Sequence, residues 1–117
     1  LPGAPAHEMI TKMGEGTAIK IMDSSTICDY RMVDYMKKIA NENDIKWQPE
    51  ILTGGGTDTA GVQRMTAGGS IAGAISIPTR HLHQVIEMAN KEDIWNSVIK
   101  KEKCILSLDK YDWEIKV

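Results

Sequence analysis

Two histidines separated by one residue are the side chains of this chain best suited to bind a metal ion. His81 and His83 follow an apolar run of strand length and lie in a polar loop at 78–84. Neutral imidazole is the commonest metal ligand in proteins, and two histidines at this spacing face the same side only where the backbone is extended. Such a pair is also common as an exposed or structural feature that binds no metal. The loop therefore offers ligands without settling that a metal is bound.

A complete metal centre needs more ligands than the sequence offers at a recognisable spacing. Zinc takes three or four protein ligands, and the chain contains neither an HExxH nor a CxxC motif. His7 and Glu8 stand in an N-terminal loop, and nothing in the surrounding sequence marks them as ligands. A metal bound at His83 must therefore take its remaining ligands from elsewhere.

The second candidate is the glycine-rich stretch Gly54-Gly55-Gly56-Thr57-Asp58. Successive glycine amides can bind an anion. The stretch lacks the Gly-Lys-Ser/Thr ending of a phosphate loop and the spacing of a dinucleotide fingerprint, so nucleotide binding is disfavoured. The glycines can instead let the backbone approach a strand or a substrate closely, and Thr57 or Asp58 can simply cap the next helix.

Strand and helix patterns alternate around both candidates. The predicted elements are a loop at 1–16, a strand at 17–22, a helix from the N-cap Asp29 to about residue 40, a strand at 47–51, a helix at 59–67, a strand at 71–77, a helix at 91–106 and a weak final strand in 107–117. Pro49 favours an edge position for the second strand, and the continuous apolar run at 71–77 predicts a strand covered on both faces. In the last helix one side is apolar, with Ile94, Val98, Ile99 and Ile105. This order predicts an α/β fold, a layered sheet with helices packed on it, in one domain of residues 1–117.

Both candidate loops, 53–58 and 78–84, follow predicted strands. In α/β sheets, ligands gather at the carboxyl ends of the strands. Parallel neighbours lie about 4.8 Å apart, or roughly twice that where one strand intervenes. We therefore predict that His83 shares one shallow pocket with residues 55–58 at the mouth of the sheet.

Composition and charge exclude several kinds of partner. Fourteen Lys and Arg against sixteen Asp and Glu give a net charge of −2, and no basic run supports a nucleic-acid or anionic-membrane partner. The longest apolar stretch, at 71–78, is interrupted and far too short to span a bilayer. Cys28 and Cys104 lie far apart in the chain, which fits buried thiols in a reducing compartment and favours a cytoplasmic protein. A disulfide between them is the alternative.

Three motifs occur in order along the chain: Met22-Asp23-Ser24-Ser25-Thr26-Ile27-Cys28, Gly54-Gly55-Gly56-Thr57-Asp58-Thr59-Ala60 and Ile75-Ser76-Ile77-Pro78-Thr79-Arg80-His81-Leu82-His83. Together they resemble the C-terminal part of the glutamyl- and deblocking-aminopeptidases, metallopeptidase family 42. Glu87, Asp93 and Asn96 also fit that pattern. The resemblance covers the chain from Leu1 to about Leu106.

The resemblance implies a zinc-exopeptidase α/β fold and an intact enzyme that is cytoplasmic and homo-oligomeric. That enzyme is expected to hold two divalent metal ions, zinc or cobalt, and to hydrolyse N-terminal residues from peptides. The family uses five metal ligands and a glutamate base, of which only the final histidine maps onto this chain, as His83. Its Asp-x-Pro-Gly motif maps onto Leu1-Pro2-Gly3, so the ligand aspartate is expected one position before the first residue. The substrate pocket is expected to be lined by Gly55, Gly56, Thr57, Asp58 and Arg80.

The chain departs from the family pattern in the loop that carries His83. The family usually has tyrosine where His81 stands and Ser-Pro where Gln84-Val85 stand. With one ligand and no base, the isolated chain is expected to be inactive, and the surface that meets the upstream part is expected to expose apolar residues. A non-catalytic folding or assembly module is the alternative function, and an unrelated small α/β binding domain is a third.

Overall fold

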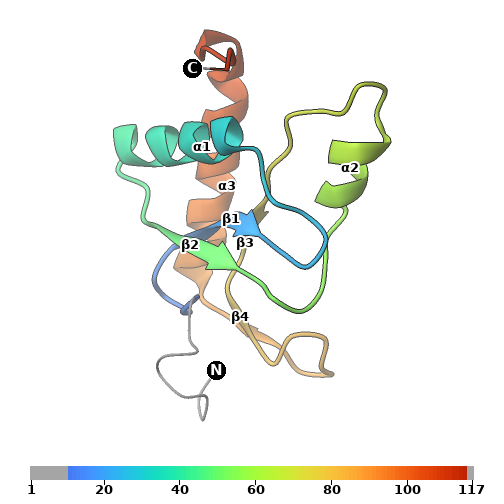
Figure 1. The fold of residues 1–117 in the computed structure, drawn as a ribbon. Coiled ribbons are helices and arrows are strands. Elements are labelled where there is room, and N and C mark those ends of the chain that lie inside the picture. Colours follow the sequence, from blue (N-terminus) through green and yellow to red (C-terminus); the bar gives the residue numbers. More distant parts are fainter. Residues whose placement is uncertain (1–10, 116–117) are drawn as a thin grey trace.

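A three-stranded sheet is the framework of the computed structural model, which describes residues 11–115 (Figure 1). Its strands are β1 (Thr17–Met22), β2 (Trp47–Ile51) and β3 (Ile75–Ser76), in the spatial order β2-β1-β3. β2 runs parallel to β1, with Lys20 opposite Glu50, whereas β3 runs antiparallel to β1. The predicted strands at 17–22 and 47–51 are confirmed, as is the edge position of the strand that contains Pro49.

In the part of the chain that the structure describes, three α-helices accompany the sheet: α1 (Tyr30–Glu42), α2 (Thr59–Met65) and α3 (Lys91–Leu106). The predicted N-cap of α1 is confirmed, because the Asp29 carboxylate accepts a hydrogen bond from Arg31 N at 2.9 Å. Ile19 packs in one cluster with residues of α1 and α3, and Ser97 Oγ of α3 lies 2.7 Å from Thr17 Oγ1. Since alternate strand residues face opposite sides, both helices cover the Thr17 and Ile19 face of β1. Among the described residues, no helix is long and apolar enough to cross a membrane.

The core lies between β1, α1 and α3, and its buried members are Ile19, Cys28, Val33, Tyr35, Met36, Ile39 and Cys104. The Tyr35 hydroxyl donates a hydrogen bond to the carbonyl oxygen of Cys104, so the one polar atom of this large side chain is satisfied. Cys28 and Cys104 are free thiols and both are buried, as predicted. The predicted layered α/β architecture is confirmed.

The tail beyond α3 differs from the prediction. Residues 107–115 form no strand; they contain a 3-10 helix, η2 (Leu108–Lys110), followed by an irregular segment. The rings of Tyr111 and Trp113 each lie 5.0 Å, centroid to centroid, from the ring of Tyr35. The aromatic side chains therefore return the tail to the core, and the apparent alternation of the sequence does not extend the sheet.

The predicted strand at 71–77 is reduced to the two residues of β3. Gly73 lies in the irregular part before it, where a Cβ would lie 2.5 Å from Met32 Cγ of α1. At Gly73 the backbone thus passes too close to the helix for a side chain, although the carbonyl oxygen of the next residue, Ala74, still accepts a hydrogen bond from Lys20 N at 3.0 Å. A run of small apolar residues can mark such a close approach as well as a buried strand.

The polar loop predicted at 78–84 belongs to a short antiparallel hairpin made of β4 (Thr79–Arg80) and β5 (Met88–Ala89). The helix that follows, α3, begins and ends as predicted, but its apolar side is not the side that is buried. Ile94, Val98 and Ile105 are exposed, whereas the buried positions are Asp93, Ser97, Lys100 and Cys104. The Asp93 carboxylate explains part of this orientation, because it accepts hydrogen bonds from Gly14 N at 2.7 Å and Gly16 N at 2.9 Å.

Candidate functional site

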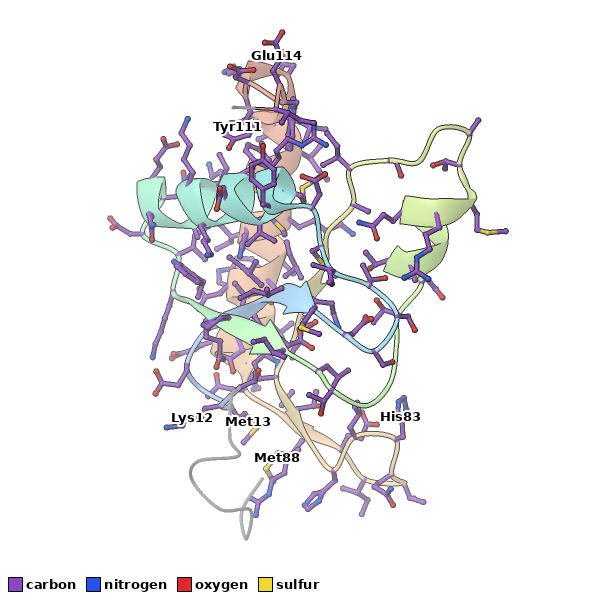
Figure 2. The ribbon with its side chains drawn as sticks, in the orientation of Figure 1. Lys12, Met13, His83, Met88, Tyr111 and Glu114 are labelled. Carbon is purple, nitrogen blue, oxygen red and sulfur yellow. The ribbon has the colours of Figure 1, made fainter. Side chains whose placement is uncertain are left out.

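His83 lies near the tip of the β4–β5 hairpin, with its side chain exposed (Figure 2). The backbone of both His81 and His83 is left-handed, with φ of 61° and 60°. This conformation costs roughly 1–3 kcal/mol for a residue other than glycine and persists only where other contacts fix it. One such contact is the hydrogen bond from His83 N to Glu87 Oε1 at 2.7 Å. The backbone of the pair is therefore not extended, and the condition under which the two rings face the same side is not met.

The imidazole of His83 is open to a ligand. Within residues 11–115 it makes no hydrogen bond or ion pair, and those residues contain no group of three His, Cys, Asp or Glu side chains that could hold a metal. His7 and Glu8 lie outside the described residues. The described part of the chain thus fits a contributor of one metal ligand and does not fit a complete metal centre.

The Gly54–Asp58 loop leaves the carboxyl end of β2 and is tied to the segment that follows β1. Gly55, with φ of 101°, accepts hydrogen bonds at its carbonyl from Ser24 N at 3.1 Å and Ser24 Oγ at 2.6 Å. At Gly56 a Cβ would lie 2.7 Å from Ser25 Oγ. The glycines therefore allow a close approach of two backbone segments. This agrees with the interpretation that the glycines let the loop approach another part of the chain and do not bind a nucleotide. Asp58 occupies the N-cap position of α2, but its side chain makes no capping hydrogen bond.

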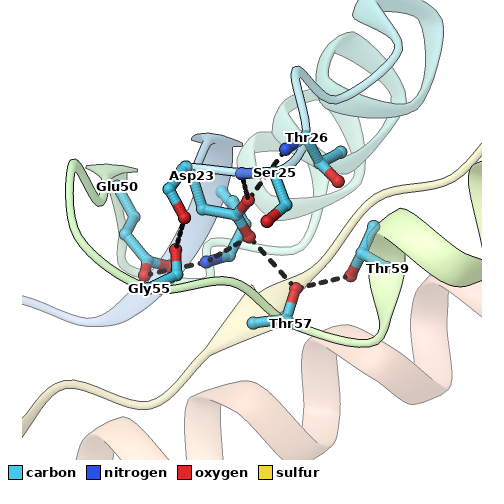
Figure 3. Close-up of polar contacts among 9 residues, drawn as sticks. Asp23, Ser25, Thr26, Glu50, Gly55, Thr57 and Thr59 are labelled. Atoms are coloured by element: carbon cyan, nitrogen blue, oxygen red, sulfur yellow. Dashed lines mark hydrogen bonds and ion pairs between the residues drawn. The ribbon is translucent and has the colours of Figure 1, made fainter.

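Asp23 joins the two segments at this edge of the sheet (Figure 3). One carboxylate oxygen, Oδ1, accepts from Ser25 N at 2.8 Å and from Thr26 N at 2.9 Å. The other, Oδ2, accepts from Thr57 Oγ1 at 3.2 Å and lies 3.5 Å from Lys20 Nζ. The Ser25 amide is the largest cause of a lowered pKa of Asp23; burial opposes it, and the Lys20 charge and the Thr57 hydroxyl lower the pKa further. Asp23 is therefore held as a carboxylate that fixes the loop.

A buried charge cluster completes this arrangement. Lys20 Nζ lies between Asp23 Oδ2 and Glu50 Oε1, at 3.5 and 3.3 Å, and its side chain is almost fully buried. Lys20 and Glu50 stand opposite each other in the parallel pair β1–β2, so they share one face of the sheet. Sequence reasoning missed the cluster because a lysine between two isoleucines in a strand normally indicates a solvent-exposed face. The available signal was the opposite charge at the paired position of the neighbouring strand.

The expectation that the two loops leave the same edge of the sheet is wrong, whereas the pocket that His83 is predicted to share with residues 55–58 stays a prediction. Because β3 runs antiparallel to β1, its carboxyl end lies beside the amino end of β1, away from the edge at which the Gly54–Asp58 loop emerges. Within the described residues, no hydrogen bond or ion pair joins Arg80 or His83 to that loop. The structure therefore brings Gly55, Gly56 and Thr57 together with Asp23, while Arg80 and His83 belong to the hairpin.

A sequence model of the family described as M42 glutamyl aminopeptidase matches residues 2–99. A putative aminopeptidase of Acetivibrio thermocellus is 43% identical over 93 residues, which are 80% of this chain and 28% of that protein. Among solved structures, aminopeptidase APDkam598 of the archaeon Desulfurococcus kamchatkensis superposes with a TM-score of 0.85 at 30% identity, over 90% of this chain and 30% of that one.

A peptidase of Pyrococcus horikoshii, TET1, has a TM-score of 0.71 at 29% identity over 80% of this chain and 27% of its own, and it is described as assembling into a tetrahedron or a large octahedral shell. The fold is thus that of the TET aminopeptidases, which have the zinc-exopeptidase fold. In each of these three comparisons, the chain spans less than a third of the length of the protein that it matches.

Proposed function

The chain belongs to the M42 glutamyl aminopeptidase family, and from this premise we propose that it is the part of a metal-dependent aminopeptidase that supplies one metal ligand, His83. The observation that carries the proposal is the exposed imidazole at the tip of the hairpin. Glu87 fixes its backbone, and the described residues contain no group of three possible ligands that could form a complete metal site. A ligand presented in this way binds a metal usefully only when another polypeptide segment brings the rest of the centre.

In the intact enzyme, two divalent ions, zinc or cobalt, would polarise the scissile carbonyl of a peptide and make a bound water more acidic. The residues of this chain have simpler tasks. His83 holds its ring toward the centre, and Gly55, Gly56, Thr57, Asp58 and Arg80 face the N-terminal part of the peptide substrate. The hydrogen bond between Thr57 and Asp23 supports this role, because it fixes the loop before substrate binds. A loop without such contacts would lose conformational entropy on binding, which weakens affinity.

Two further properties accompany this proposal. The intact enzyme is a homo-oligomer, for which the shells described for the TET1 peptidase of Pyrococcus horikoshii are the support. It works in the cytoplasm, for which the two buried free thiols, Cys28 and Cys104, are the support, since such thiols fit a reducing compartment.

The test of this proposal uses the isolated chain with His81→Ala as the matched control for His83→Ala. We expect no hydrolysis of aminoacyl-p-nitroanilides above background with added zinc or cobalt, because one ligand cannot hold a catalytic pair of metals. Calorimetric titration with zinc should show affinity no tighter than micromolar, weakened more by His83→Ala than by His81→Ala. A nanomolar site, or metal-dependent turnover by the isolated chain, would show that this chain carries a centre of its own.

A further inference from the structure

The hairpin formed by β4 and β5 contains a tight turn whose third residue is His83 (Figure 2). The Gln84 amide donates a hydrogen bond to the carbonyl oxygen of His81 at 3.1 Å, which closes the turn over Leu82 and His83. A positive φ at the third residue of such a turn usually requires glycine or asparagine, yet His83 has a φ of 60°. His81, the first residue of the turn, is also left-handed, with a φ of 61°. The turn therefore holds two histidines in a strained conformation that needs support from other contacts.

Glu87 supplies this support from a fixed position. It directly precedes β5, whose Met88 pairs with Arg80 of β4, so strand pairing anchors its backbone. Its Oε1 accepts a hydrogen bond from His83 N at 2.7 Å, a short distance that is typical of a charged acceptor. The bond acts on the amide of the residue whose φ is positive. Glu87 thus fixes the turn at the position where a side chain is least easily accommodated.

The fixed turn determines how many metal ligands the hairpin can present to one ion. Side chains two residues apart lie on the same side only where the backbone is extended. The side chains of His81 and His83 are both exposed, and in an extended tip they would chelate one metal ion together. Two linked ligands bind more tightly than one, because the second binding step is intramolecular. The left-handed backbone at both histidines removes this arrangement.

We propose that Glu87 is a positioning residue that keeps His83 a single metal ligand, because it holds the turn in the conformation in which His81 cannot join it. The inference rests on the proposed function, in which His83 is one ligand of a larger metal centre. Chelation by both histidines would occupy two coordination positions at the exposed tip of the hairpin and leave fewer for the other ligands and the water of a catalytic centre. Glu87 acts through the backbone amide of His83 and needs no contact with the metal or the substrate.

The experiment measures the zinc affinity of the full chain by calorimetric titration at neutral pH. We expect Glu87→Ala to tighten zinc binding by roughly tenfold or more, since the released tip becomes extended and both histidines chelate the ion. Adding His81→Ala to Glu87→Ala should return the affinity to that of the unaltered chain. Glu87→Gln should leave the affinity unchanged, because its amide oxygen still accepts the hydrogen bond from His83 N. Glu102→Ala, which removes an exposed carboxylate from α3, is the matched control and should also leave the affinity unchanged.

Amide hydrogen exchange at His83 reports the hydrogen bond itself, and it should accelerate in Glu87→Ala but not in Glu87→Gln. Three results of the titration would overturn the proposal: zinc binding by Glu87→Ala that is unchanged or weaker, tightening that persists without His81, or an equal change with Glu87→Gln. Weaker binding would make Glu87 a ligand and not a positioning residue.

The ligand role of His83 is tested separately by His83→Ala in the otherwise unaltered chain. If this variant binds zinc more weakly while Glu87→Ala has no effect, only the role of Glu87 fails. If His83→Ala has no effect while Glu87→Ala still tightens binding through both histidines, only the proposed function fails.

Discussion

Replacing Lys100 with methionine should stabilise the chain, because Lys100 is a buried amine for which residues 11–115 provide no hydrogen-bond partner. Its side chain is 0% exposed, and among the described residues its Nζ has no hydrogen-bond partner. Burial lowers the pKa of Lys100 from 10.5 to about 8, although the nearby Cys104 thiol acts in the opposite direction. Methionine has a similar length and volume and carries no charge, so the substitution removes the buried amine without opening a large cavity.

The magnitude follows from the difference between the folded and unfolded pKa of Lys100. A lowering of about 2.5 units corresponds to roughly 3 kcal/mol of unfolding free energy, since each unit is about 1.4 kcal/mol. The folded pKa lies below the unfolded one, so the unfolded chain binds more protons and its protonation disfavours folding. The penalty is therefore complete below about pH 8 and decreases as the pH rises toward about 10.5.

Urea denaturation followed by tryptophan fluorescence measures this penalty as the difference between Lys100→Met and the unaltered chain. The expected gain in unfolding free energy is about 3 kcal/mol at pH 7 and about 1.4 kcal/mol at pH 9.5. The subtraction is needed because burial raises the pKa of the Cys28 and Cys104 thiols, whose contribution to stability is lost as the pH rises through their folded pKa values. Lys101→Met, at an exposed position of the same helix, is the matched control and should change stability by less than about 0.5 kcal/mol.

The reasoning is refuted if Lys100→Met destabilises the chain at pH 7, because the amine would then have a partner that stabilises its charge. It is also refuted if the gain is equal at pH 7 and pH 9.5. In that case the stabilisation would come from better packing of methionine and not from the removal of a titrating group.

Two further perturbations concern the Gly54–Asp58 loop. Asp23→Asn should accelerate amide hydrogen exchange at Ser25 and Thr26, because their amides donate hydrogen bonds to the Asp23 carboxylate. Since the pKa of Asp23 is lowered in the folded chain, its contribution to stability is present above the unfolded pKa and is lost as the pH falls through the folded pKa. The variant should therefore lose this part of the acid dependence of unfolding. Exchange at both amides that is unchanged by the variant would contradict the role of Asp23. Gly56→Ala should lower the melting temperature measurably, since the added Cβ would lie 2.7 Å from Ser25 Oγ. The control Gly54→Ala should leave the melting temperature unchanged, because a Cβ at that position meets nothing within 4 Å. Equal effects of the two substitutions would contradict the close approach at Gly56.

Local patterns predicted the elements whose partners lie nearby in this chain. Strand β1, helix α1 with its N-cap Asp29 and strand β2 were predicted to within two residues, and the apolar side of α1 is the side that is buried. The direction of β3 was not predictable, because antiparallel pairing of two residues with β1 depends on the path that Gly73 allows past Met32. The buried cluster at Lys20 was missed for a related reason: a charge in a strand shows its partner only when the pairing register is known.

The apolar periodicity of a helix reports which residues share a side, but not what that side faces. In α1 the apolar side, with Val33, Met36 and Ile39, meets β1 of the same chain, so prediction and structure agree. In α3 the same kind of pattern does not coincide with burial, because the buried side is the one with Asp93 and Lys100. In α3 the inward side is fixed by the hydrogen bonds of Asp93 and Ser97, which apolar side chains could not replace, so polar contacts and not apolar periodicity determine which side of this helix is buried.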